Sequence, residues 1–260
     1  MKLHFEVSGN GEPLVILHGL LGSLTNWQTV GKGLSSRFGV YRLDLRNHGQ
    51  SPHSDIHTYG AMAGDLVEFF HDHRIETAHL LGHSMGGKVA MTFALSHPTK
   101  AKSLIVIDIS PKAYHSHHID LLEALSSLRL QDITSRKMAE AQLATLIPDA
   151  RTRRFLLTNL KQETTGRFRW RLNIKTLKDS YTEVTKGLHT DKIFPGTTLF
   201  VRGGKSNSIE SADLPLIKRV FPAAKIVTVP SAGHWVHIDS PNELLQTIVG
   251  FLDAQRLVHP

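Results

Sequence analysis

A serine between two glycines is the feature of this chain that most directly indicates chemistry. Residues 82–86 read Gly-His-Ser-Met-Gly and stand between an apolar run and a stretch of helical periodicity. The two glycines allow a tight turn from a strand into a helix, because a Cβ at either position would collide with a neighbouring element. In such a turn the hydroxyl of Ser84 is exposed at a helix N-terminus, where the helix dipole favours a developing anion. The pattern predicts that Ser84 is a nucleophile.

A nucleophilic serine needs a base, and His234 is the best placed of the 17 histidines. It lies in residues 231–237, Ser-Ala-Gly-His-Trp-Val-His, directly after the last expected strand and before the last expected helix. In a parallel sheet this loop lies at the same edge as Ser84, so the imidazole is expected to take the proton of the serine hydroxyl. We expect His83 and His237 to have structural roles.

The acid that orients the histidine has more than one candidate. Asp108 ends an otherwise apolar strand at the same edge of the sheet, and burying a carboxylate there is costly unless it has a partner. In many hydrolases the acid follows the penultimate strand, but here that place holds Ser206, and the next carboxylate is Glu210. We expect Asp108 to be the acid, with Glu210, or no carboxylate at all, as the alternatives.

Two backbone N–H groups are expected to stabilise the oxyanion that forms when a serine attacks a carbonyl. One belongs to Met85, which follows the nucleophile at the N-terminus of its helix. The other is expected from residues 18–22, His-Gly-Leu-Leu-Gly, which follow an early strand. Within that loop we expect Leu20 to supply the N–H, and the side chains of Leu20 and Leu21 to face the substrate pocket.

Further pocket residues are expected near the nucleophile and in the middle of the chain. Lys88 lies one helical turn after Ser84 and faces the same side of the helix. It is expected either to form a structural ion pair or to contact an anionic substrate. The tryptophans Trp27, Trp170 and Trp235 are expected in the pocket or at the interface beside it, where aromatic rings would suit an acyl chain.

The elements that must position these residues alternate between strands and helices. Residues 1–7 are expected to form a first strand. Runs rich in Val, Ile and Leu, as in strands buried on both faces, lie at 14–17, 40–45, 78–81, 103–109, 197–202 and 225–229. Helical stretches lie at 27–36, 59–71, 85–96, 209–221 and 242–255. This order predicts an α/β fold with a mostly parallel central sheet and helices on both faces.

The alternation stops between residues 111 and 196. Helical patterns at 119–130, 135–147, 151–162 and 168–187 occupy this stretch, and no convincing strand does. About 85 residues are too many for a structureless loop. We therefore expect a core domain of residues 1–110 and 197–260 and an inserted helical cap of residues 111–196. The cap carries +6 of the total net charge of +7, which indicates either a solvated helical face or attraction of an acidic substrate or carrier.

The composition excludes several classes of protein. The 260 residues are sufficient for one large core, and the absence of cysteine excludes disulfides, a thiolate nucleophile and Cys-ligated zinc. No apolar run approaches the roughly 18 residues of a membrane span, and the N-terminus lacks the apolar core of a secretory signal, which favours the cytoplasm. The basic residues follow no nucleic-acid-binding motif. The histidine clusters at 71–73 and 115–118 lack a matching distant carboxylate, so no metal is expected.

The chain resembles the α/β-hydrolase superfamily over its whole length. The matching pieces are residues 18–19, 44–51, 82–88 and 233–237. Where the family usually has Asp-x-Arg-Gly-x-Gly, this chain has Asp-Leu-Arg-Asn-His-Gly. That departure, together with Lys88, residues 108–111 and residues 168–171, resembles the YbfF-like esterase branch. The resemblance implies a Ser-His-Asp triad, no cofactor, and an acid after the strand that follows the nucleophile, which is the position of Asp108.

The residues and the resemblance together predict a serine hydrolase of small-molecule acyl esters or acyl-CoA-type thioesters, acting through an acyl-enzyme. The substrate is expected to be anionic if the basic cap takes part in binding it. A cofactor-free lyase or a carbon–carbon bond hydrolase of the same fold is the main alternative. A ligand receptor without activity is a third possibility, which the full set of catalytic residue types argues against.

Overall fold

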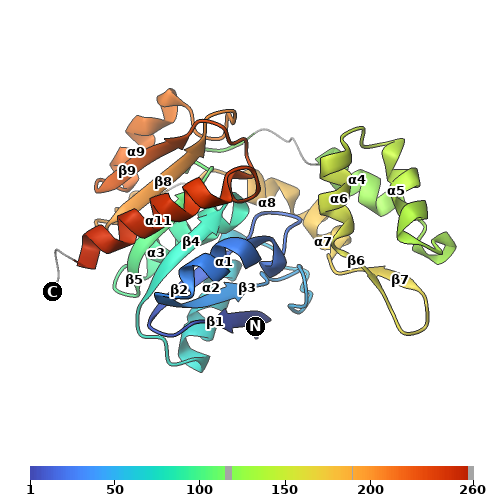
Figure 1. Cartoon of the computed structure of the whole chain (residues 1–260), viewed down its shortest axis with the longest axis horizontal. Helices are drawn as coiled ribbons and strands as arrows, with labels where there is room; N and C mark the ends of the chain where they lie inside the picture. The colour runs from blue at the N-terminus through green and yellow to red at the C-terminus, as the bar shows by residue number, and fades with distance from the viewer. Residues whose placement is uncertain (115–118, 189, 257–260) are drawn as a thin grey trace.

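A seven-stranded sheet forms the centre of the molecule (Figure 1). The structure is a computed structural model that describes residues 1–114, 119–188 and 190–256. The strand order is β1-β3-β2-β4-β5-β8-β9, and only β1 runs antiparallel to its neighbour. The strands are β1 (Phe5–Ser8), β2 (Glu12–Leu17), β3 (Phe38–Leu43), β4 (Ala78–His83), β5 (Ala101–Ile107), β8 (Thr198–Gly203) and β9 (Ala224–Val229).

Each central strand buries alternate residues on opposite faces of the sheet. In β2, Leu14 and Ile16 belong to one apolar cluster, whereas Val15 and Leu17 belong to the other. The first cluster includes side chains of α1 (Gln28–Leu34) and α11 (Pro241–Arg256). The second includes side chains of α2 (Tyr59–Asp72), α3 (Met85–Ser96) and α9 (Leu214–Val220). Because helices cover both faces, the strands are continuously apolar, and the predicted α/β-hydrolase class is confirmed.

The ends of several elements differ from the sequence-based expectation; β3, for example, covers Phe38–Leu43 where a strand over 40–45 was expected. The helix expected over residues 27–36 is α1 (Gln28–Leu34), and a 3-10 turn that was not expected, η1 (Leu24–Trp27), precedes it. Another, η3 (Ser211–Asp213), precedes α9, whose first turn contains a proline. None of the helices in the described part of the chain is both long and apolar enough to cross a membrane.

Residues 111–196, called here the inserted segment, leave the sheet after β5 and return before β8. Its elements are α4 (Ile119–Ser127), η2 (Leu130–Asp132), α5 (Arg136–Ala144), α6 (Ala150–Leu157), β6 (Leu160–Gln162), β7 (Phe168–Trp170), α7 (Ile174–Asp179) and α8 (Tyr181–Thr185). A further short helix, α10 (Val236–Asp239), follows β9 in the core. Figure 1 shows α4, α5, α6, α7 and the β6–β7 hairpin gathered to one side of the sheet. Whether the segment is a separate domain with the predicted boundaries stays a prediction.

The expectation of a helix over residues 168–187 is wrong. The stretch begins with β7, which pairs antiparallel with β6, and continues as two short helices. The hairpin turn is closed by backbone hydrogen bonds from Gly166 to Glu163 O and from Glu163 to Arg167 O, with Gly166 at a φ of 82°. Strands of three residues are too short to show a period of two in the sequence, which is why the hairpin was missed.

Hydrogen bonds attach the inserted segment to the core. The hydroxyl of Tyr59 donates to Val184 O at 2.6 Å, and Asn173 Nδ2 donates to Asn47 Oδ1 at 3.1 Å. The backbone N–H of Asn173 also donates to Asn47 O at 3.0 Å. These bonds join the end of α8 and the start of α7 to the core, so the segment has a defined place over the sheet edge.

Candidate active site

Ser84 occupies a sharp turn between β4 and α3. Its φ is 52° and its ψ is −119°, a strained conformation for a residue with a side chain. A Cβ on Gly82 would lie 2.2 Å from Gly86 O, and one on Gly86 would lie 2.4 Å from Leu17 O. The turn therefore requires glycine at both positions, as the spacing in the sequence predicted.

The structure brings Ser84, His234 and Asp108 together. His234 Nε2 lies 3.1 Å from Ser84 Oγ, and His234 Nδ1 lies 2.8 Å from Asp108 Oδ2. A carboxylate only accepts, so Nδ1 carries the proton and Nε2 is free to accept the proton of the serine. The His234 side chain is 30% exposed while that of Asp108 is fully buried, so a substrate can reach the base but not the acid.

Asp108 is held by donors on both of its oxygens. Gly203 N donates to Oδ1 at 2.8 Å, and the hydroxyl of Ser206 donates to Oδ2, which also accepts from His234. The residue directly follows β5 with a φ of 49°, and its own N–H donates to Val201 O. These bonds offset the cost of burying the charge.

Glu210, the alternative acid, pairs with a lysine, whereas His234 Nδ1 bonds to Asp108. Its carboxylate is exposed and accepts from Lys112 Nζ at 3.2 Å. Its neighbours in the chain are nearer to the site: Ser208 Oγ lies 3.1 Å from His234 Nδ1 and 3.1 Å from Ser206 Oγ. From the sequence, Ser206 was noted as an uncharged residue in the usual place of the acid, but its hydrogen bond to Asp108, which follows the neighbouring strand, was missed.

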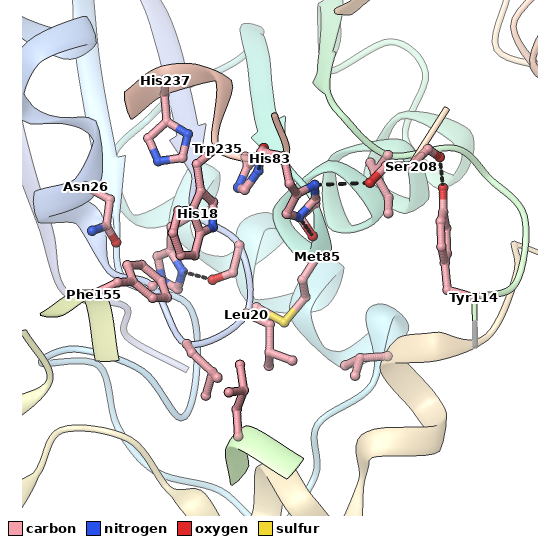
Figure 2. Close-up of a pocket in the computed structure, with 18 of the residues that line it drawn as sticks. His18, Leu20, Asn26, His83, Met85, Tyr114, Phe155, Ser208, Trp235 and His237 are labelled. Atoms are coloured by element: carbon pink, nitrogen blue, oxygen red, sulfur yellow. Dashed lines mark hydrogen bonds between the residues drawn. The ribbon is translucent and has the colours of Figure 1, made fainter. Parts of the chain in front are cut away.

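Figure 2 shows His83, Met85 and Leu20 near the centre of the site. His83 Nε2 donates to His234 O at 2.8 Å, so this buried ring supports the loop that carries the base. Burial lowers the pKa of His83 well below its usual value, which keeps it neutral beside His234. The expected structural role of His83 agrees with these contacts.

The orientation of the Leu20 N–H follows from the peptide group that contains it. The oxygen of that peptide, Gly19 O, accepts from His18 Nδ1 at 2.8 Å and from Gly22 N at 3.0 Å (Figure 2). In a trans peptide the N–H points opposite to the C=O, so Leu20 N–H is directed away from these two donors. Met85 is the first residue of α3, where backbone N–H groups have no partner within the helix. Leu20 and Met85 both line the cavity at Ser84.

The cavity has a volume of about 310 Å³ and a mostly apolar and aromatic lining. Leu20, Leu21, Trp27 and Trp235 line it, as expected, and so does Tyr114. Figure 2 shows His237, Asn26, Phe155 and Trp235 to one side of the site, and Ser208 and Tyr114 to the other. A cavity of this size and character is typical of a small-molecule site.

Two residues expected in the pocket are not among those that line the cavity. Trp170 belongs to the β6–β7 hairpin and packs, partly buried, against the apolar cluster that the inserted segment shares with α2, α3 and α9. Lys88 is only 1% exposed, and its ammonium group donates to Lys186 O. Its Nζ lies 4.9 Å from the ring centre of Tyr114 and 5.6 Å from that of Tyr59, and both of these rings line the cavity. Burial lowers the pKa of Lys88 to about 8. Its contacts are therefore structural, although with a carbonyl and aromatic rings rather than the ion pair that was considered.

No group of three or more His, Asp or Glu side chains suited to a metal ion exists in the described residues. The cluster at residues 71–73 is thus not part of such a group. The cluster at residues 115–118 lies outside the described residues.

Comparison with known proteins identifies the family. A family model described as the alpha/beta hydrolase fold matches residues 12–241. The chain is 40% identical over 256 residues to sn-1-specific diacylglycerol lipase ABHD11 of Danio rerio, and the match covers 95% of this chain and 80% of that protein. It is 32% identical over 245 residues to Esterase YbfF of Escherichia coli (strain K12), which covers 94% of each.

The solved structure of a marine microorganism esterase is similar over almost the entire chain. It matches with a TM-score of 0.93 and 41% sequence identity, and the match covers 96% of this chain and 99% of that one. The chain therefore belongs to the α/β-hydrolase family, in the esterase branch that includes YbfF.

Proposed function

We propose that this protein is a serine ester hydrolase in which Ser84, His234 and Asp108 are the catalytic triad. The observation that carries the proposal is the pair of hydrogen bonds that runs from Ser84 Oγ through the imidazole to a fully buried carboxylate, beside a cavity of suitable size. The names of its relatives, which include a diacylglycerol lipase and an esterase, support an ester substrate.

The reaction proceeds in two halves. Ser84 Oγ attacks the acyl carbonyl carbon while His234 Nε2 takes the hydroxyl proton, and the N–H groups of Leu20 and Met85 stabilise the oxyanion. The intermediate then expels the alcohol or thiol, which receives the proton from His234 and leaves Ser84 acylated. Water attacks this acyl-enzyme, gives a proton to His234, and releases the carboxylic acid as Ser84 regains its proton. Asp108 holds the imidazole in the tautomer that each half requires.

The test is the removal of the serine hydroxyl. Ser84→Ala should lower turnover of p-nitrophenyl acyl esters by about 10⁶-fold. Ser84→Gly is the better-matched variant, because glycine tolerates the φ of 52° and the fold should remain intact. Undiminished turnover by either folded variant would refute the assignment, and so would failure of a fluorophosphonate to label the wild-type serine.

We further propose that thioesters of acyl-CoA type are among the substrates. The net charge of +6 on the inserted segment supports this, since it favours an anionic leaving group near the site. Rates for acyl-CoAs and for simple esters of the same acyl chain should be compared at low and at high salt. A preference for the CoA ester that falls with salt is expected, and equal salt dependence for the two substrates would contradict it.

A further inference from the structure

Asn159 of the inserted segment contacts the loop that carries Leu20. It lies between α6 and β6, is only 1% exposed, and donates from Nδ2 to Leu21 O at 2.8 Å. Its second amide proton points to Leu156 O at 3.3 Å. Both partners are carbonyl oxygens, so they fix the amide with its nitrogen toward the loop. The contact spans 138 residues of sequence.

Leu21 is also bonded to the core through its backbone N–H. Leu21 N donates to His48 Nε2 at 3.2 Å, and His48 Nδ1 donates to Arg46 O at 2.9 Å. Leu21 has a φ of 61°, a conformation that costs free energy for a residue with a side chain and persists only when its surroundings hold it. Its N–H and its C=O thus have separate partners in the core and in the inserted segment.

Three successive peptide groups of the loop are therefore fixed. Gly19 O accepts from His18 and Gly22, Leu21 N donates to His48, and Leu21 O accepts from Asn159. The Leu20 N–H lies in the first of these peptides. Of these contacts, the bond from Asn159 is the one that comes from outside the core.

We propose that Asn159 is a positioning residue for the oxyanion hole, so that the inserted segment must be seated on the core for the Leu20 N–H to point at the reacting carbonyl. Asn159 is not among the residues that line the cavity. It restrains Leu21, and the restraint passes through two peptide groups to the N–H of Leu20. This inference rests on the proposed function, because it assigns a support to the oxyanion donor of that reaction.

The expected effect is on turnover rather than on binding. Complete loss of an oxyanion donor costs about 10²- to 10³-fold in kcat. A donor that is still present but less well oriented should cost about 10- to 100-fold, with KM changed by less than about threefold. The pH profile should keep its shape, because Asn159 makes no contact with His234 or Asp108.

The matched experiment compares Asn159→Ala with Asn173→Ala. Both substitutions remove an asparagine side chain of the inserted segment that bonds to a core loop, but Asn173 bonds to Asn47 and not to the oxyanion loop. Rates are divided by the concentration of active sites, measured by titration with a fluorophosphonate, so that loss of folded protein does not count. We expect Asn159→Ala to lose kcat and Asn173→Ala to stay within about twofold of the wild type. Affinity for a boronic acid, which mimics the tetrahedral intermediate, should fall with kcat in Asn159→Ala alone.

A second variant covers the case in which Asn159→Ala does not fold. Asn159→Ser keeps a donor for Leu156 O, as Thr158 has for Phe155 O, but is too short to reach Leu21 O. It should show the same loss of kcat. If the wild-type Ser84 is labelled but these Asn159 variants turn over as fast as Asn173→Ala, the inference is overturned while the proposed function stands. If Ser84 is not labelled, the proposed function and the inference about Asn159 are both refuted.

Discussion

Replacing Asp108 by asparagine tests which carboxylate serves His234. The carboxylate accepts from Gly203 N, from the Ser206 hydroxyl and from His234 Nδ1. An amide has one oxygen and one NH₂ group. If its oxygen accepts from Gly203 N, its NH₂ group faces the imidazole of His234 and the hydroxyl of Ser206, which are both donors in the native site. The imidazole must then move its proton to Nε2, the nitrogen that has to accept from Ser84.

The magnitude follows from this change of tautomer. Loss of the correct tautomer lowers kcat by about 10⁴-fold, which corresponds to about 5.5 kcal/mol in the activation free energy. The substitution should not disturb the backbone, because asparagine is among the few residues that accept the φ of 49° found at this position. Asp108→Ala would add backbone strain to the chemical effect and is less suitable.

The assay is steady-state hydrolysis of a p-nitrophenyl ester, with Glu210→Gln as the matched control. That change is also from carboxylate to amide, but Glu210 is exposed and bonds to Lys112, so kcat should stay within about twofold. If Asp108→Asn retained more than about a tenth of the wild-type kcat, or if Glu210→Gln lost as much, the assignment of the acid would be refuted.

Two further predictions concern stability. Gly82→Ala would place a Cβ 2.2 Å from Gly86 O, in backbone that cannot move without moving Ser84, and should lower the free energy of unfolding by about 3 kcal/mol. Gly64→Ala in α2, where a Cβ meets nothing within 4 Å, should instead raise it by about 1 kcal/mol, and equal denaturation midpoints for the two variants would contradict this. Burial lowers the pKa of His18 to about 4 and that of His48 to about 3. Between pH 6.5 and these values the unfolded chain binds protons that the folded chain does not, so each histidine should cost about 1.4 kcal/mol of stability per pH unit as the pH falls. Urea denaturation at pH 7, 6 and 5 measures this, and stability that does not change with pH would show that the rings are not buried in the neutral form.

The parts of the site that depend on local sequence patterns and on the order of the elements could be predicted from the sequence. The glycines around Ser84 have a local steric cause, and the position of His234 after the last strand follows from the geometry of parallel sheets. The cost of burying Asp108 predicted that it has partners, and the structure gives it three. These inferences needed only the local pattern and the order of the elements.

Other features depend on contacts between distant parts of the chain, which no local pattern contains. The bond from Asn159 to Leu21 and the place of the Lys88 ammonium group are of this kind. Lys88 has the helical spacing of a pocket residue, but it is buried against the ring of Tyr114 and is not among the residues that line the cavity. Trp170 was expected in the pocket for its residue type alone, whereas the short hairpin that holds it decides where its ring packs.

The order of the catalytic groups along the chain has a consequence for how the molecule could be divided. Leu20, Ser84 and Asp108 all come before the inserted segment, and His234 comes after it. The segment joins β5 to β8, which pair side by side in the sheet. A polypeptide cut inside the segment would yield one fragment with the nucleophile, the acid and the oxyanion loop, and another with the base and with Gly203 and Ser206, which donate to the acid. Hydrolysis by the mixture would then require the fragments to associate along β5 and β8. If each fragment were fused to another protein, hydrolysis would report that the two fused proteins bind each other.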